Sequence, residues 1–335
     1  MHQSTSTMAA EPNPLPSSGE DSSDSETEEL LVHKPPRNHK LYYHDWVAPC
    51  LGLLVWPGMW TVPLLLSSPY SPISYRDVFP EQWYTVSDSP KPLGLLLGIL
   101  AVAVGQVGVL CFFYLFRQGY LGPRTSIQTK GARPYDFTEG VTTHLAQPEG
   151  FGLLAGYLTV TWMFHLMPES YYSFEGGIQW HLVFLCLVLQ DGLQYVMHIL
   201  EHVLSPRFYQ LSHKPHHRFT NPRLFDAFNG SLADTLCMIV IPLLTTANLV
   251  RTSNVWTYMT FGSTYACWLT LIHSEYVFVW DGFFRSLGLG TPADHHVHHK
   301  FFKFNYGHLC LWFDWVGGTY RDPRSFAPKV FRENV

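Results

Sequence analysis

Charged residues are scarce in this sequence. They make up 14% of its 335 residues, whereas soluble domains average about 25%. Another 47% of the residues are hydrophobic, and the formal net charge of −5 leaves no basic surface of the kind that binds nucleic acid. The chain lacks the polar surface that a water-soluble protein of this length needs, so we expect much of it to lie in a membrane.

Several catalytic and binding motifs are also absent. The six cysteines stand apart in apolar stretches with no Cys-x-x-Cys pair, so we expect buried thiols and no disulfide framework. Nucleotide-binding glycine motifs and Gly-x-Ser-x-Gly do not occur. The His-Glu-x-x-His motif of zinc proteases and the Glu-x-x-His motif of ferritin-like bundles are missing too. Any reaction that consumes NAD(P)H would therefore need a partner protein.

Long apolar stretches follow an acidic, Ser-rich tail. Residues 1–40 contain few apolar side chains, and we expect them to be disordered. A bilayer core needs about 20 apolar residues per helix. The first four stretches below qualify as spans, and the last two form either two further spans or a shallow hairpin. The stretches are Trp46–Ser68, Pro92–Phe116, Gly150–Met167, Ile178–Leu200, Leu236–Val250 and Val255–Ile272.

Basic residues set the expected orientation. They cluster before the first stretch and after the second, which places both regions in the cytosol under the positive-inside rule. With either four or six crossings, the histidine-rich segments then return to the cytosolic face. We predict an all-α membrane protein of four to six apolar helices with a cytosolic helical cap. The basic residues are Lys34, Arg37, Lys40, Arg117, Arg124, Lys130 and Arg133.

Three histidine clusters dominate the second half of the chain. Imidazoles three or four residues apart share one face of a helix, and neutral imidazole is a common ligand of iron, zinc and copper. The clusters supply more donors than one ion can use, so we predict a two-metal centre. They are His198-Ile-Leu-Glu-His202, His213-Lys-Pro-His216-His217 and His295-His296-Val-His298-His299.

The flanking residues refine this prediction. Asp191 lies on the helical face of the first cluster, and a carboxylate in an apolar helix usually indicates function. Thr291-Pro-Ala-Asp294 has the pattern of a helix start, which would direct His296 away from the site. Pro215 disfavours helical geometry just before it, so we expect His213 to lie on a turn. His273, at the end of the last apolar stretch, is a further candidate ligand.

In this order, the motifs resemble the fatty acid hydroxylase/sterol desaturase superfamily of membrane di-iron enzymes. The family pattern is His-x-x-x-His, His-x-x-His-His, an isolated His and His-x-x-His-His. The segment His213-Lys-Pro-His-His217 looks like its sterol C-5 desaturase version. Two flanking segments, Phe304-Asn-Tyr-Gly307 and Phe313-Asp-Trp-Val-Gly-Gly-Thr-Tyr-Arg321, also resemble the family.

The resemblance implies a domain organisation and a ligand set. A catalytic domain would span residues 150–325, after membrane helices and a cytosolic connector in 41–149 and before a C-terminal tail in 326–335. Two iron ions would bind there, with zinc as a substitute, and Asp191, Asn229, Asp294 and His308 would lie around the ligands or join them. The implied ligands are His198, His202, His213, His216, His217, His273, His295, His298 and His299.

The resemblance also implies a reaction. The enzyme would use O₂ and electrons to desaturate or hydroxylate a lipid, with a sterol-type substrate favoured. Cytochrome b5 and its NAD(P)H reductase would supply the electrons, at the endoplasmic reticulum. Two alternatives remain open from the residues: hydroxylation of a fatty acyl or sphingoid chain, and a membrane protein that binds or transports zinc without redox chemistry.

Overall fold

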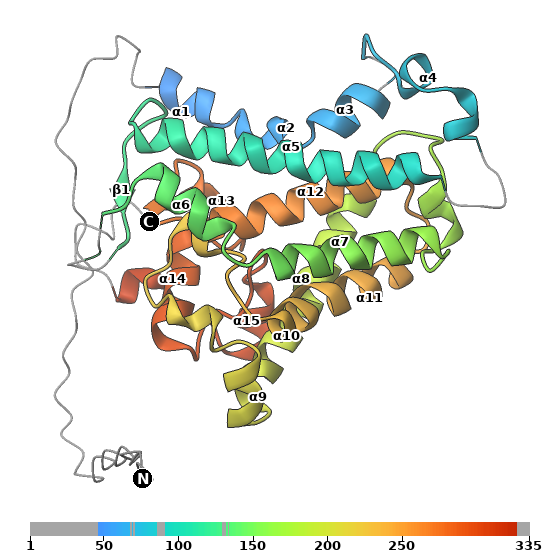
Figure 1. Ribbon diagram of the computed structural model, residues 1–335. Helices are drawn as coiled ribbons and strands as arrows, with labels where there is room; N and C mark the ends of the chain where they lie inside the picture. The colour runs from blue at the N-terminus through green and yellow to red at the C-terminus, as the bar shows by residue number, and fades with distance from the viewer. Residues whose placement is uncertain are drawn as a thin grey trace, which may run out of the picture.

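The computed structural model describes residues 46–67, 69, 71–85, 91–128, 132 and 134–326. The predicted acidic tail, the basic residues Lys34, Arg37, Lys40, Lys130 and Arg133, and the segment 327–335 lie outside the described residues. The described part is mostly helical, as predicted for the fold class (Figure 1). Its one sheet pairs two short antiparallel strands, β1 (Thr125–Ser126) and β2 (Tyr276–Val277).

The first predicted span is broken into three helices. They are α1 (Val47–Gly52), α2 (Val55–Gly58) and α3 (Thr61–Ser67), and the chain bends by 64° before α3. A proline within each helix, at positions 49, 57 and 63, removes a backbone donor and disfavours a straight helix here. This stretch is apolar throughout, so hydropathy alone did not reveal the bend.

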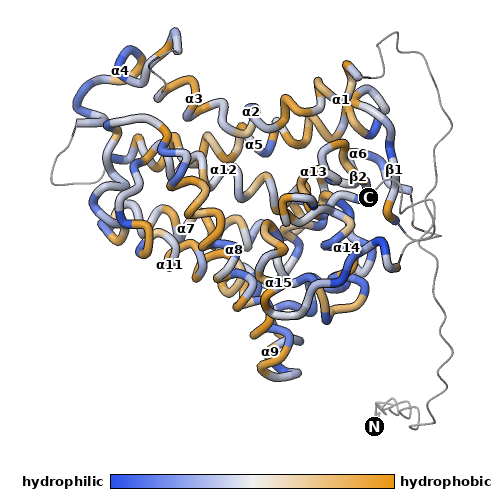
Figure 2. The backbone as a smooth tube through the Cα atoms, turned by 180° about the vertical axis from the view of Figure 1, so that it is seen from behind, coloured by the Kyte–Doolittle hydropathy of each residue, from blue (hydrophilic) through white to orange (hydrophobic). Residues whose placement is uncertain are grey.

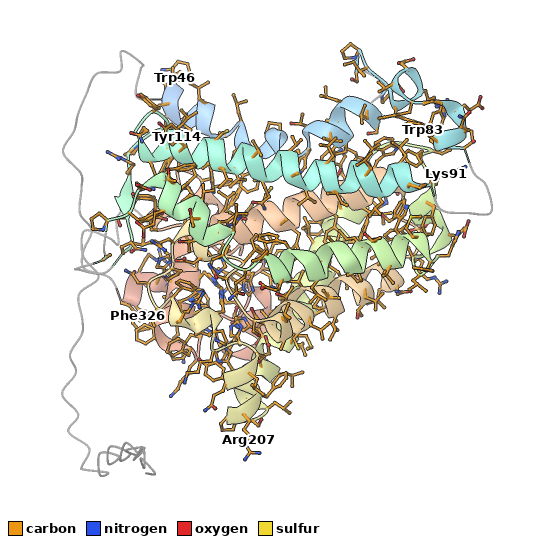
Figure 3. All side chains as sticks on the ribbon, viewed as in Figure 1. Trp46, Trp83, Lys91, Tyr114, Arg207 and Phe326 are labelled. Carbon is orange, nitrogen blue, oxygen red and sulfur yellow. The ribbon has the colours of Figure 1, made fainter. Side chains whose placement is uncertain are left out.

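The second predicted span is one straight helix, α5 (Pro92–Arg117). Its 26 residues extend about 39 Å at about 1.5 Å each, enough to cross a hydrocarbon core of about 30 Å. Lys91 and Tyr114 mark its two ends in Figure 3. Helices α2 and α3 lie along one side of α5, and α12 (Val255–Ile272) lies along the other (Figure 1).

Helix α12 is enclosed by its neighbours. All but three of its 18 residues are buried, and the exceptions are Tyr258, Gly262 and Ala266. It contacts both α5 and α8 (Trp180–Val203). Gly105 of α5 permits the close approach, because a Cβ there would lie 2.5 Å from the Oγ of Ser263.

Three helices in the described part are long and apolar enough to cross a membrane, or four if the bent N-terminal pair counts as one span. They are α5, α8 and the continuous segment Leu232–Leu249, which comprises α10 (Leu232–Thr235), a π-helical stretch (Leu236–Val240) and α11 (Ile241–Leu249). Helix α7 (Pro148–Met163), with 16 residues, is shorter than a full span. These helices make the chain a membrane protein, with a helix count close to the one predicted.

Short helices gather at one end of the bundle (Figure 1), and one of them, α14 (Pro292–Phe301), carries four histidines. Figure 2 shows hydrophilic residues concentrated around α14, in contrast to the hydrophobic α7 and α11. The short α-helices here are α6 (Phe137–His144), α9 (Pro206–Leu211), α13 (Asp281–Ser286), α14 (Pro292–Phe301) and α15 (Trp312–Gly317); α4 (Tyr75–Val78) lies near the other end. The 3₁₀ turns are Glu81–Trp83, Glu169–Tyr172, His216–Arg218, Leu224–Asp226 and Pro323–Ser325.

Candidate metal centre

The first histidine pair lies on the last turns of α8. His198 and His202 are four residues apart and share one face of the helix. The helix ends at Val203, and Pro206 then starts α9 with Ser205 as its N-cap. Ser205 and Pro206 therefore end α8 just after His202 and set the start of α9, which leads to the second histidine cluster.

The second cluster lies on a turn, as its proline suggested. The carbonyl oxygen of His213 accepts hydrogen bonds from the backbone N–H groups of His216 and His217, which begin a 3₁₀ turn. The tight turn separates the three rings. Two of them, His213 and His217, face the pair on α8. The third, His216, faces His273 and two histidines of α14.

The third cluster lies on α14, which has the predicted start. Thr291 and Asp294 form a capping box with Pro292 at the first helical position. His295, His298 and His299 project toward the other clusters, while the Nδ1 of His296 contacts the carbonyl oxygen of Pro292. His273 lies immediately after α12, as its C-cap.

The structure divides the nine histidines of the implied ligand set into two neighbouring groups. Within each group, one donor atom per residue lies within 4.8 Å of all the others. The groups adjoin, since the ring centroids of His217 and His299 are 5.1 Å apart. The first group is His198, His202, His213, His217 and His298, and the second is His216, His273, His295 and His299.

Hydrogen bonds fix the protons on four of these rings. The Nδ1 atoms of His198, His298 and His273 lie 2.7–2.8 Å from the carbonyl oxygens of Tyr306, Phe304 and Leu269. A carbonyl oxygen can only accept, so each Nδ1 carries the proton and donates it. The Nδ1 of His213 likewise donates to Asp234, at 2.7 Å. In all four neutral rings, Nε2 is left with a lone pair that faces the interior of its group.

The facing Nε2 atoms lie at the spacing of ligands around a metal ion. The Nε2 atoms of His198 and His213 are 2.9 Å apart, although both carry lone pairs and neither can donate to the other. Other neighbouring Nε2 pairs in the two groups are 3.0–3.3 Å apart. Two nitrogens bound at right angles, each about 2.1 Å from one ion, would lie about 3.0 Å apart. The donor set therefore fits two transition-metal ions.

Burial keeps the loop histidines neutral. It lowers the pKa of His213 to about 3 and the pKa of His216 to about 4. On α14, burial holds the pKa values of His295 and His299 well below the usual range. Metal ligation requires neutral imidazole, so these side chains are ready to bind without first losing a proton.

Asp234 is a functional candidate that sequence reasoning missed. Its carboxylate accepts the Nδ1 proton of His213, an arrangement that orients a ligand ring and raises its basicity. The Oε2 of Glu201, on α8, lies 3.7 Å from the same Nδ1. In the sequence, Ser231-Leu-Ala-Asp234 has the pattern of a helix start, and Ser231 is indeed the N-cap of α10. That local signal gave no hint of the contact with His213.

Asp191 holds a loop and does not face the two groups. Its carboxylate accepts three backbone N–H groups, those of His308, Leu309 and Cys310, at 2.7–3.2 Å. Asp314 likewise accepts the N–H groups of Tyr306 and its neighbour Gly307, both at 2.8 Å. The loop held by these two carboxylates presents the carbonyl oxygen of Tyr306 to His198.

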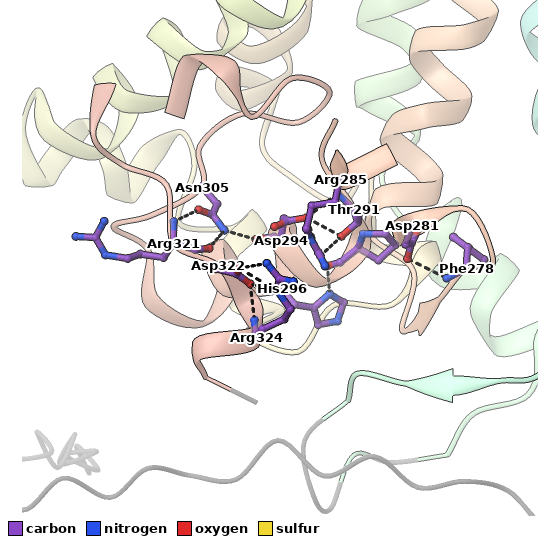
Figure 4. A network of polar contacts seen from close by, with 11 residues as sticks. Phe278, Asp281, Arg285, Thr291, Asp294, His296, Asn305, Arg321, Asp322 and Arg324 are labelled. Atoms are coloured by element: carbon purple, nitrogen blue, oxygen red, sulfur yellow. Dashed lines mark hydrogen bonds and ion pairs between the residues drawn. The ribbon is translucent and has the colours of Figure 1, made fainter. Parts of the chain in front are cut away.

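Asp294 serves the start of α14. Arg285 and Thr291 both donate to its carboxylate (Figure 4). Burial raises the pKa of Asp294, and the charge of Arg285 opposes that rise. Asn305 donates to the carbonyl oxygen of Asp294 and to that of Arg321. This network fixes the helix from which three of the histidines project.

The two remaining candidates differ in position. The Oδ1 of Asn229 accepts from Arg218, and its Nδ2 donates to the carbonyl oxygen of Thr143, so its side chain is engaged outside both groups. His308 is buried between the groups, with its ring centroid 5.2 Å from that of His198 and 4.9 Å from that of His295. It belongs to neither group of mutually close donors.

Comparison with known proteins places this site in a family. The fatty acid hydroxylase family model matches residues 183–319, which include all nine histidines. The chain is 72% identical over 323 residues to a protein of Phaeodactylum tricornutum named Alternative squalene epoxidase, covering 93% of this chain and 92% of that protein. The chain therefore belongs to the fatty acid hydroxylase/sterol desaturase superfamily, and it is an oxidoreductase of lipid oxidation.

More distant relatives are sterol desaturases. A Delta(7)-sterol 5(6)-desaturase of Saccharomyces cerevisiae is 30% identical over 37% of this chain and 33% of its own length. A Delta(7)-sterol-C5(6)-desaturase of Nicotiana tabacum is 30% identical over 41% of this chain and 48% of its own length. The chain thus matches less than half of each of these two desaturases. No solved structure matches the chain.

Proposed function

We propose that this enzyme is a membrane di-iron oxygenase that converts squalene to its epoxide. One oxygen atom of O₂ would enter a carbon–carbon double bond, and the other would leave as water after taking up two electrons and two protons. The observation that carries the proposal is the 72% identity to Alternative squalene epoxidase over 93% of the chain. The sterol desaturases share only about 30% identity, over a much shorter segment.

The two groups of histidines are the proposed metal ligands. When bound, the two iron ions would supply the redox chemistry that activates O₂. The chain's own part is to keep nine neutral imidazoles converged, with rings held by Asp234 and by the carbonyl oxygens of Tyr306, Phe304 and Leu269. Eight of the nine histidines are buried, which limits the access of water to the reacting centre.

The expected partners and location follow from the family. Cytochrome b5 and its NAD(P)H reductase would deliver the electrons, and the endoplasmic reticulum would be the site of action with the histidines on the cytosolic face. The position of His202 at the end of a membrane-length helix supports placement at a membrane surface. Squalene is wholly apolar, so such a placement would bring the metal centre close to where the substrate dissolves.

The test is a labelled-oxygen assay on the full chain. The purified protein is combined with cytochrome b5, its reductase, NADH and squalene-loaded vesicles under ¹⁸O₂, and its metal content is measured. We expect two iron ions per chain and a squalene epoxide carrying one labelled oxygen. A sample treated with an iron chelator should form none.

Three outcomes would replace the proposal. Desaturation of a Delta(7)-sterol with no oxygenated squalene would favour the sterol desaturases as the functional model. Labelled hydroxyl groups on fatty acyl or sphingoid chains would favour the hydroxylase alternative. Bound zinc, no iron and no O₂ uptake would favour a protein without redox chemistry.

A further inference from the structure

One histidine of the two groups reaches the surface. His202 is half-buried, whereas the other eight are buried. The ring of Tyr209 packs beside it, with centroid distances of 5.1 Å to His202 and 6.2 Å to His217. The backbone carbonyl of Tyr209 also accepts the N–H of His213, so α9 is tied to the second cluster. Of the nine histidines, His202 is therefore the most accessible from outside the protein.

The surface around Tyr209 is apolar and basic. Helix α9 projects from the bundle, with Arg207 at its tip (Figures 1 and 3), and Figure 2 shows hydrophobic residues along it. Residues 203–218 contain no acidic side chain. Apolar and basic residues together are typical of a helix that lies at the surface of an anionic membrane. The exposed members are Val203 (64%), Leu204 (64%) and Leu211 (73%), with Arg207, Lys214 and Arg218.

This surface continues from an exposed apolar side of α8. Leu185, Val196 and Leu200 are exposed on that helix, and Val203 and Leu204 follow them toward α9. The two acidic residues of α8, at positions 191 and 201, are buried, so no exposed acidic side chain of this helix interrupts the apolar surface. A lipid beside α8 can therefore reach α9 without leaving an apolar surface.

A small cavity near the site lies on the outer, Nδ1 side of the His213 ring. A cavity of about 30 Å³ between α7 and α10 is lined by Phe151, Ala227 and Asp234, among others. Asp234 contacts the Nδ1 of His213, whereas the inward-facing atom is Nε2. A molecule in this cavity would have to pass the His213 ring to reach the centre, whereas one at Tyr209 meets the rings of His202 and His217 directly.

We propose that α9 lies in the membrane surface and forms the lipid entrance to the metal centre, with Tyr209 contacting the substrate chain as it passes His202. The inference rests on the proposed function, because it names the route by which the apolar substrate arrives. It assigns Val203, Leu204 and Leu211 to contact with lipid.

The depth of α9 can be measured without turnover. A spin label is placed at Leu211→Cys or, as a control, at Lys303→Cys, which is exposed in the loop after α14. Both variants carry serine in place of Cys50 and Cys111, the two cysteines that are exposed and not buried as the sequence predicted. In vesicles of phosphatidylcholine and phosphatidylserine, we expect the label at 211 to collide mainly with O₂. The label at 303 should collide mainly with a water-soluble nickel complex.

Two results of this measurement would overturn the inference. In the first, the label at 211 is as accessible to nickel as the label at 303. In the second, it becomes protected only when cytochrome b5 is added, which would make α9 a surface for a protein partner. Neither result depends on squalene turnover, so each is distinguishable from a failure of the proposed function, which shows as the absence of oxygenated squalene with the unaltered chain.

The entrance itself is tested by steric substitution. Tyr209→Trp should raise the KM for squalene in vesicles about tenfold, the scale of a steric mismatch in an apolar passage, with kcat and iron content unchanged. Ala227→Val, which narrows the cavity beside Asp234, should leave KM unchanged. A raised KM in Ala227→Val with none in Tyr209→Trp would overturn the inference, as would loss of iron in Tyr209→Trp.

Discussion

At the residue scale, the Nδ1 atoms, which hold the histidine rings in place, matter as much for the site as the Nε2 atoms that face the interior of each group. Three of the four Nδ1 contacts that fix the rings go to backbone carbonyl oxygens, and one goes to a carboxylate, Asp234. A carbonyl contact survives most side-chain substitutions, whereas the contact to Asp234 can be removed by a single one. His213 is therefore the ring whose orientation is most open to test.

Asp234→Asn should weaken metal binding without unfolding the protein. The amide oxygen can still accept the Nδ1 proton, but the negative charge that strengthens His213 as a ligand is lost. We expect iron affinity to fall about 10- to 100-fold, the usual range for loss of such a partner. Competition with a chelator measures the change. Asp322→Asn, on a carboxylate that pairs with Arg324 at the surface, is the control and should leave affinity unaltered.

Spacing in the sequence was sufficient to identify eight of the nine converging histidines, because residues three and four apart share a helix face or a tight turn. His273 stands alone in the sequence and was a candidate only from its place at the end of an apolar stretch. Spacing was not sufficient for Asp234 or for the carbonyl oxygen of Tyr306. The first is joined to His213 across 21 residues and the second to His198 across 108. A backbone carbonyl also carries no mark in the sequence that distinguishes it from any other.

At the scale of elements, hydropathy predicted where helices run but not how they meet. The bend before α3 and the enclosure of α12 were both missed. The hydroxyl groups of α12 explain its place inside the bundle, since Thr260 and Thr264 donate to carbonyl oxygens one turn back and Ser263 donates to Met59. With these groups satisfied, a helix containing many hydroxyls can be buried at little cost.

The contact between α5 and α12 depends on a missing side chain at Gly105. Gly105→Leu should lower the free energy of unfolding by about 1–3 kcal/mol, because the new atoms would overlap Ser263 and Cys267. Gly108→Leu is the matched control on the same helix, where a Cβ meets nothing within 4 Å. Thermal unfolding in detergent compares the two. Equal melting temperatures would mean that the helices do not pack as closely as described.

At the scale of the whole molecule, the metal centre joins segments that are otherwise far apart in the chain. The two groups draw on α8, the turn after α9, the end of α12, and α14. Without cations, lone pairs such as those of His198 and His213 face each other at 2.9 Å in a buried site. Bound metal would remove that repulsion, so we expect it to stabilise the fold as well as to support the reaction.

Removal of the metal should therefore lower the melting temperature. A ligand present at 100 times its dissociation constant stabilises the native state by about 2.7 kcal/mol, and chelation removes that amount. The shift is measured by thermal unfolding with and without chelator. It should persist in His181→Ala, which changes an exposed histidine on α8, and shrink in His298→Ala. An equal shift in both variants would argue against the first group as a binding site.

The distribution of the ligands along the chain also sets the order of events during synthesis. Each group includes a histidine of α14, at position 298 in one and at positions 295 and 299 in the other. Neither ion could then find a full set of donors until that helix had left the ribosome, long after α8 had entered the bilayer. Iron would be loaded late, into a polypeptide whose membrane helices were already in place.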